Sequence, residues 1–275
     1  MIGSNGSTAD PYLALNWSSN HSHIPMRLPY WYTLPTGYAA RSPRVVPAQR
    51  TAAFVVLGQS NGAAYGVGAP FAPVNNTVVD SMSIFNGGIY EGKDPGPNMD
   101  GPGISWLYRF ADLLITAGHY DRVIMVPAAM GSARCADYAP GGVLQRFPAV
   151  AHRRLAAMGL PVTAYLWQQG EGDGGGAVSA AQYQAMLQSI IDGSRLAGSA
   201  APWLIGKSTY SLGVTSAEVR AGCAAVVNGT DVFNGADTDT LTAAYRAADN
   251  VHFNATGCAS AASLWRAAAV AALGL

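Results

Sequence analysis

Charged residues are scarce in this chain of 275 residues, and neither sign is in excess. Lysine and arginine together number 16, aspartate and glutamate also number 16, and the four types make up only 12% of the sequence. Proteins that bind nucleic acid or an anionic membrane surface through charge carry a basic excess or a basic run. We therefore expect neither nucleic acid nor a membrane among the partners.

Long apolar runs and targeting signals are also missing. No stretch reaches the roughly 18 apolar residues of a membrane span, and Arg266 interrupts the alanine-rich C-terminal stretch. The start, MIGSNGSTADPY, lacks the basic and apolar regions of a signal peptide, although a mature form would already have lost one. We expect a soluble protein of unknown localisation, with secretion and association with a virion both left open.

Metal-ligand spacings are absent as well. The three cysteines, Cys135, Cys223 and Cys258, show no C-x-x-C spacing, and their odd number leaves at least one unpaired within the chain. We expect buried reduced thiols, with a bridge between Cys223 and Cys258 as the alternative. The pair His21-x-His23 has no further ligand at metal spacing, so we expect no metal and no cofactor.

Residues 1–50 differ in composition from the remainder of the chain. They are rich in proline and aromatic residues, and they show no sustained helical or strand period. Trp17, Tyr30, Trp31 and Tyr32 are too many large aromatics for a disordered tail. The composition predicts an N-terminal extension that packs on a domain formed by residues 51–275 or on another subunit, in a homo-oligomer.

From residue 52 onward the pattern alternates between strands and helices. Apolar strands are expected at 52–57, 122–127, 162–167, 202–207 and near 232, with helices around 106–114, 148–158, 183–191, 215–227 and from 255. Strands that are apolar on both faces and alternate with helices predict a parallel sheet covered on both sides. We therefore expect a three-layer α/β/α domain.

Several polar residues follow these strands directly. Ser60 follows the first strand, Gly131 and Gln169 follow later ones, and Asp249 and His252 precede the last helix. In open α/β sheets, sites lie at the carboxyl ends of the strands, so these residues should meet at one edge. A hydroxyl activated by an imidazole, which a carboxylate holds in one tautomer, is the machinery of a serine esterase.

The segment Gly58-Gln59-Ser60-Asn61-Gly62 matches the G-x-S-x-G elbow of α/β-hydrolases. That fold is unlike this chain, because here the serine follows the first core strand and the acid stands three residues before the histidine. Over about residues 52–270, the motifs GQSN, MGS, WQQGEGD and DNVH instead resemble the SGNH (GDSL-like) hydrolases. Within them the sequence resembles the sialate O-acetylesterase and acetylxylan esterase group, which is similar to carbohydrate esterase family 6.

The resemblance implies a flavodoxin-like SGNH fold and a role for each motif residue. Ser60 resembles the nucleophile, His252 the general base and acid, and Asp249 the carboxylate that orients it. The oxyanion hole would consist of the backbone N–H groups of Ser60 and Gly131 and the side-chain amide of Gln169. The family commonly has two glycines where this chain has Met130-Gly131.

Four further motif residues are candidates for support of the site: Gln59, Asn61, Glu171 and Asp173. We expect Glu171 and Asp173 to brace the loops through hydrogen bonds. The loops at about 63–100, 132–146 and 172–180 are expected to contact the substrate.

The expected function is hydrolysis of acetyl esters on a carbohydrate through an acetyl-Ser60 intermediate. A sialic acid, a xylan or a bacterial surface polysaccharide could supply the sugar. Two other functions stay open: a non-catalytic glycan-binding or phage-tail structural module with the same fold, and a glycoside hydrolase that uses Glu171 and Asp173 as its paired carboxylates.

Overall fold

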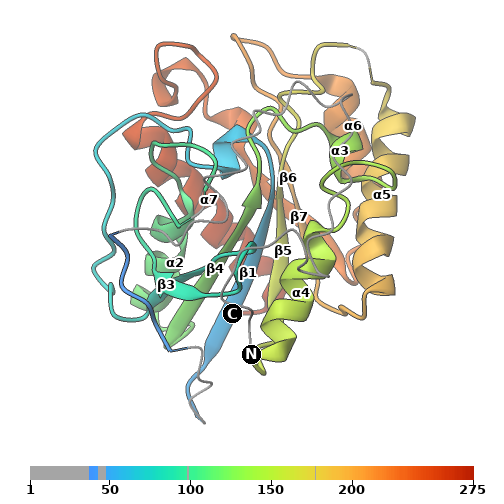
Figure 1. Ribbon diagram of the computed structural model, residues 1–275. Helices are drawn as coiled ribbons and strands as arrows, with labels where there is room; N and C mark the ends of the chain where they lie inside the picture. The colour runs from blue at the N-terminus through green and yellow to red at the C-terminus, as the bar shows by residue number, and fades with distance from the viewer. Residues whose placement is uncertain (1–36, 43–47, 98, 177) are drawn as a thin grey trace.

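The computed structural model of the chain describes residues 37–42, 48–97, 99–176 and 178–275. Within these residues a seven-stranded sheet is covered by helices on both faces, as the alternating pattern predicts (Figure 1). The strands are β1 (Thr51–Gly58), β2 (Val79–Met82), β3 (Ile89–Glu91), β4 (Arg122–Ala129), β5 (Ala164–Gln168), β6 (Trp203–Lys207) and β7 (Val232–Asp237). The α-helices are α2 (Leu107–Thr116), α3 (Cys135–Tyr138), α4 (Phe147–Ala157), α5 (Ala180–Leu196), α6 (Ala217–Ala225) and α7 (Ala255–Leu273).

The strand order is β3-β2-β4-β1-β5-β6-β7, and every neighbouring pair is parallel except β2 with β3. Strand β1 therefore lies between β4 and β5, and the chain builds the sheet first on one side of β1 and then on the other. Apart from β2 and β3, this is the flavodoxin-like order, in which ligands bind where the direction of winding reverses. The carboxyl end of β1 is that position.

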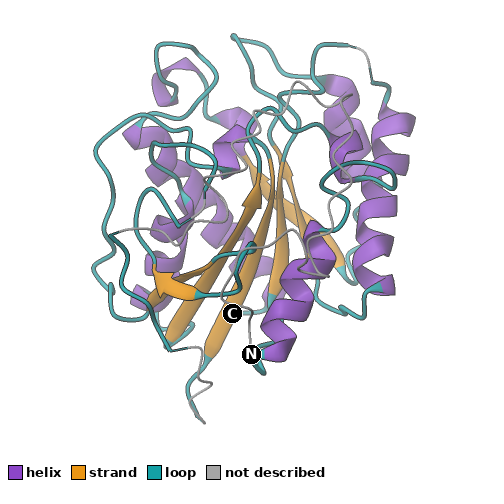
Figure 2. Cartoon of the chain, viewed as in Figure 1, coloured by secondary structure: helices purple, strands orange, loops and turns teal. Residues whose placement is uncertain are grey.

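Strand β1 separates two hydrophobic cores because its side chains alternate between the faces of the sheet. Ala53, Val55 and Leu57 join a core with residues of α4, α5 and α6. Phe54 and Val56 join a second core with residues of α2 and α7. Figure 2 shows these two groups of helices on opposite sides of the strands. Burial on both faces explains why β1 is a continuous apolar run in the sequence.

The expected loop at 63–100 contains two strands that the sequence analysis missed. Strands β2 and β3 extend the sheet beyond β4, with β2 parallel to β4 and β3 antiparallel to β2. They have only four and three residues, too few for a period to stand out among their glycine-rich and proline-rich neighbours.

Part of the predicted N-terminal extension lies within the described residues. Ala40 pairs with Tyr90 of β3, and the backbone N–H of Arg41 donates to the carbonyl of Ile89 at 2.8 Å. Residues 1–36 and 43–47 lie outside the described residues, and so do the four aromatics and His21 and His23. The role of the extension in packing or oligomer formation stays a prediction.

The three cysteines are buried and unbridged, as expected for reduced thiols. Burial raises the pKa of the Cys223 and Cys258 thiols to about 12, which keeps them protonated at neutral pH. Within the described part of the chain, no helix has the length and apolar character that crossing a membrane requires.

Candidate active site

The turn after β1 presents Ser60 at the carboxyl edge of the sheet. Gly58 ends β1 with φ of +136°, and a Cβ at this position would lie 2.0 Å from the carbonyl oxygen of Gln168. Only glycine tolerates both conditions, which explains the first glycine of the motif. Ser60 then begins a single turn of 3₁₀ helix, η1 (Ser60–Gly62), and only 6% of the residue is exposed.

Asp249 and His252 form a hydrogen-bonded pair just before α7. The Nδ1 atom of His252 lies 2.6 Å from Oδ2 of Asp249, while Oδ1 accepts the backbone N–H groups of Val251 and His252 at 2.9 and 3.0 Å. Partial burial works to raise the pKa of Asp249, but these hydrogen bonds hold it below its usual value. An ionised Asp249 therefore accepts a hydrogen bond from Nδ1–H of His252, which leaves Nε2 as the basic nitrogen.

Asn61 joins the turn of Ser60 to the segment that carries His252. Its Nδ2 donates to the carbonyl of Val251 at 3.2 Å, and its Oδ1 accepts the backbone N–H of Phe253 at 3.1 Å. These are the two residues on either side of His252. The residue after the proposed nucleophile thus fixes the backbone on both sides of the proposed base.

Within the described residues, Ser60 Oγ makes no hydrogen bond, so none links it to His252. In esterases without bound substrate, catalytic hydrogen bonds are often long and tighten only when the substrate is present. The structure brings the turn of Ser60, His252 and Asp249 to one edge of the sheet, as predicted, and the assignment of their roles stays a proposal.

The side-chain amide of Gln169 lies fully buried in a hydrogen-bonded network. Its Nε2 has three acceptors: Asp173 Oδ2 at 2.6 Å, Gln59 Oε1 at 3.2 Å and the carbonyl of Ala133 at 3.3 Å. Its Oε1 accepts the hydroxyl of Tyr183 at 2.6 Å. An amide has two N–H hydrogens, and both are engaged here. The geometry is that of a brace, and the expected donation to an oxyanion would require one of these bonds to break.

Glu171 and Asp173 hydrogen-bond the loop after β5 to neighbouring segments. Oε1 of Glu171 accepts Nδ2 of Asn61 and Oγ of Ser208, each at 2.8 Å. Asp173 accepts the backbone N–H of Cys135 at 2.9 Å in addition to Gln169. Both carboxyl residues are less than 9% exposed. Burial is the main cause that raises the pKa of Glu171 to about 7, and it also raises the pKa of Asp173.

Gln59 completes this network from the side of β1. Besides accepting from Gln169, its Oε1 accepts the backbone N–H of Gly172 at 2.8 Å. The residues before and after Ser60 therefore both bind the Trp167–Asp173 segment. All four candidates for site support are in hydrogen-bond contact with another motif residue.

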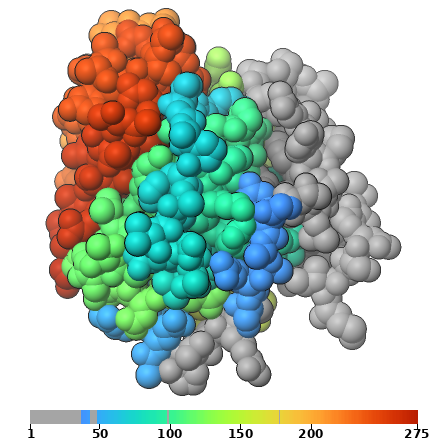
Figure 3. Space-filling model, turned by 90° about the vertical axis from the view of Figure 1, so that its left-hand side faces the viewer, coloured from blue at the N-terminus to red at the C-terminus, as the bar shows by residue number. Residues whose placement is uncertain are grey.

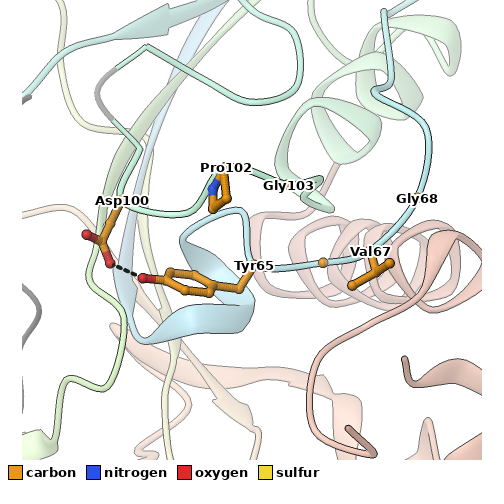
Figure 4. Close-up of a pocket in the computed structure, with 7 residues that line it drawn as sticks. Tyr65, Val67, Gly68, Asp100, Pro102 and Gly103 are labelled. Carbon is orange, nitrogen blue, oxygen red and sulfur yellow. Dashed lines mark hydrogen bonds between the residues drawn. The ribbon is translucent and has the colours of Figure 1, made fainter. Parts of the chain in front are cut away.

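Gly131 follows β4 and meets two residues that the sequence analysis did not select. Its backbone N–H donates to Asp100 Oδ2 at 2.8 Å. The hydroxyl of Tyr65 donates to the same oxygen at 2.8 Å, the bond drawn in Figure 4. The ring of Tyr65 stacks on the imidazole of His252, with centroids 5.5 Å apart. Tyr65 and Asp100 lie outside the sequence motifs, so their place at the site follows from the fold alone.

Arg246 is another residue of the site that the sequence did not reveal. Its guanidinium is buried against the rings of Tyr210 and Phe253, and it donates to the carbonyl of Val251 at 2.8 Å. The carbonyl that accepts from Asn61 is therefore held from two sides. A single arginine in a loop gives no periodic signal that could have predicted this contact.

A three-layer α/β/α fold with Ser60, His252 and Asp249 at the carboxyl edge of a parallel sheet is an architecture typical of serine-type ester hydrolases. The chain belongs to the family described as carbohydrate esterase, sialic acid-specific acetylesterase, whose family model matches residues 50–269. This confirms the resemblance inferred from the motifs. The protein is therefore an enzyme of the carbohydrate O-acetylesterase class.

Solved structures show the same fold at low sequence identity. A protein from Arabidopsis thaliana superposes with a TM-score of 0.64 and 17% identity, covering 82% of this chain and 99% of its own. NanS superposes with a TM-score of 0.56 and 14% identity, and the match covers 83% of this chain and 98% of NanS. A carbohydrate acetylesterase from Xanthomonas citri superposes with a TM-score of 0.54 and 14% identity, and the match covers 81% of this chain and 57% of that chain. No curated protein sequence matches significantly.

Proposed function

We propose that this enzyme removes acetyl groups from carbohydrate hydroxyls through an acetyl-Ser60 intermediate. The observation that carries the proposal is the joint position of the three groups. Asp249 holds Nδ1 of His252 at 2.6 Å, and Asn61 ties the backbone on both sides of His252 to the turn of Ser60. Acyl transfer requires a nucleophile, a base and an orienting carboxylate, and these bonds hold together the two segments that carry the three groups.

In the first half of the reaction, Ser60 Oγ attacks the acetyl carbonyl carbon while its proton passes to Nε2 of His252. The carbonyl π electrons move to the oxygen, and the backbone N–H groups of Ser60 and Gly131 are the proposed donors to this oxyanion. Collapse of the intermediate breaks the bond to the sugar oxygen, which takes the proton from His252. Water then attacks the acetyl-enzyme in the same way and releases acetate.

A hollow beside Tyr65 is the proposed position of the sugar. Its volume is about 460 Å³. The lining residues are Tyr65, Gly66, Val67, Gly68, Asp100, Pro102 and Gly103. Val67 N–H donates to the carbonyl of Phe253 at 2.8 Å, so this loop borders the C-terminal segment on the surface (Figure 3). The lining carries one carboxylate and no cation, which favours an uncharged acetylated sugar over a sialic acid.

Acetate release from a panel of acetylated glycans, with 4-nitrophenyl acetate as a control ester, tests the proposal. Ser60→Ala should lower kcat on both kinds of substrate by ~10³-fold or more with an unchanged melting temperature. Substantial glycan cleavage by this variant would instead support a glycoside hydrolase. Full glycan binding by a wild-type protein that releases no acetate from any ester would support the binding-module alternative.

A further inference from the structure

One oxygen atom in the loop before α2, a carboxylate oxygen of Asp100, accepts hydrogen bonds from two donors that follow β1 and β4 at the carboxyl edge of the sheet. Oδ2 of Asp100 accepts the backbone N–H of Gly131 at 2.8 Å and the hydroxyl of Tyr65 at 2.8 Å. Donors that stabilise an oxyanion lie 2.7–3.1 Å from the position it will occupy. The position now filled by Asp100 Oδ2 meets this requirement with respect to both groups.

The lack of a side chain at residue 131 leaves room for this contact. A Cβ on residue 131 would lie 2.5 Å from the Tyr65 hydroxyl and 2.6 Å from Asp100 Oδ2. Glycine at 131 therefore allows the phenol and the carboxylate to approach its backbone N–H. These contacts explain why residue 131 is a glycine, and the explanation does not require a second glycine at position 130.

Tyr65 is fastened to both the nucleophile turn and the base. Its backbone N–H donates to the carbonyl of Ser60 at 3.3 Å, and its ring stacks on His252 at a centroid distance of 5.5 Å and an interplanar angle of 24°. The Tyr65 hydroxyl is thus positioned by the same groups that are proposed to carry out the reaction.

Asp100 is the movable member of this contact. The backbone next to it is pinned, since the N–H groups of Gly101 and Gly103 donate to the carbonyls of Ala63 and Ala64, both at 2.7 Å. Its other oxygen, Oδ1, is buried without a hydrogen-bond partner. A buried, half-satisfied carboxylate gains hydration when it turns toward water, so rotation of the side chain alone can vacate the position.

From this geometry we propose that the Tyr65 hydroxyl and the Gly131 N–H together bind the oxyanion, and that Asp100 occupies their position until an ester displaces it. The inference rests on the proposed function and adds a donor and a competing group to it. The acetyl carbonyl oxygen takes the place of Asp100 Oδ2 and gains negative charge as Ser60 attacks. A carboxylate left in place would repel that charge and block the donors.

Two variants test the role of Tyr65 as a donor and the role of Asp100 as a competing group separately. Tyr65→Phe removes the donor and keeps the ring stacked on His252, so kcat on 4-nitrophenyl acetate should fall by ~10²-fold with little change in KM. Asp100→Ala removes the competing group, so kcat/KM should rise, by about tenfold if the open arrangement is a one-in-ten population. The double variant should lose most of the gain.

Tyr120→Phe and Asp192→Ala are the matched controls. Tyr120 precedes β4 at the opposite edge of the sheet from the site, and Asp192 is exposed on α5. Both should behave as wild type. If Asp100→Ala melts below the assay temperature, Asp100→Ser supplies the test, because its side chain is polar, uncharged and too short to reach the position of Oδ2. A normal kcat in Tyr65→Phe, or no gain in folded Asp100 variants, overturns the inference.

These results are distinguishable from failure of the proposed function. If Ser60→Ala retains activity, the serine mechanism is wrong whatever Tyr65 does. If Ser60→Ala is inactive while Tyr65→Phe is normal, only the inference about the oxyanion position fails.

Discussion

The buried carboxyl of Glu171 makes a quantitative prediction about stability and pH. The residue is 8% exposed, Oε1 accepts from Asn61 and Ser208, and Oε2 is a buried atom without a hydrogen-bond partner. Burial raises its pKa from 4.5 to about 7, against the opposing effects of the hydrogen bonds and of the charge of Arg246. A proton on Oε2 is therefore retained in the folded protein at pH values where an exposed glutamate has lost it.

The direction of the effect follows from the two pKa values. Because the folded value exceeds the unfolded one, the stability contributed by this group is fully present below about pH 4.5 and is lost as the pH rises through about 7. A pKa raised from 4.5 to about 7 corresponds to about 3 kcal/mol of unfolding free energy. Glu171→Gln cannot ionise and should lack this loss.

Urea unfolding of wild type and Glu171→Gln at about pH 5 and about pH 8 measures the difference. The stability of wild type relative to the variant should fall by about 2.5 kcal/mol between the two conditions, because the remainder of the loss has already occurred at pH 5, while effects of all other groups cancel. Glu218→Gln, at an exposed position on α6, is the matched control and should show no such change. If the two stability curves of wild type and Glu171→Gln run parallel, Glu171 is ionised throughout and the reasoning fails.

Two further substitutions test the network around the site. Asn61→Ala should cost about 2–4 kcal/mol of stability and lower kcat, because Phe253 N–H loses its acceptor and His252 its anchor on both sides; a normal kcat below the melting transition would contradict this. Gln169→Ala should lower the melting temperature by several degrees and leave kcat near normal at low temperature, because Asp173 and Tyr183 lose their buried partner. A loss of ~10² to 10³-fold in kcat at an unchanged melting temperature would instead support the oxyanion role of Gln169.

The main elements of the fold could be predicted from the sequence because each carries a long signal. Strand β1 is an eight-residue buried strand, and α5 shows Tyr183, Leu187 and Ile191 on one face. Strands β2 and β3 were missed because they are short and owe their place to pairing, of β2 with β4 and of β3 with β2, rather than to local pattern. Pairing between distant segments leaves no periodic trace in a single sequence.

The motif residues of the site could also be predicted, but their hydrogen-bond partners could not. Ser60, Asp249 and His252 lie in short segments whose chemistry is visible from residue type and spacing. The engagement of Gln169 by Asp173, and of Gly131 by Asp100, depends on side-chain directions that the fold determines. Sequence spacing placed these groups at one edge of the sheet and could not say which donors were already occupied.

The attachment of Asn61 to both neighbours of His252 has a consequence for engineering the enzyme. Through these bonds the turn of Ser60 and the segment of His252 are held together as one unit. Residues 65–103 contact that unit through the ring of Tyr65 and a few backbone hydrogen bonds. Val67 and Pro102 line the hollow and are exposed, so substitutions of their side chains leave these bonds in place. Substrate preference can therefore be altered separately from the parts that perform the chemistry.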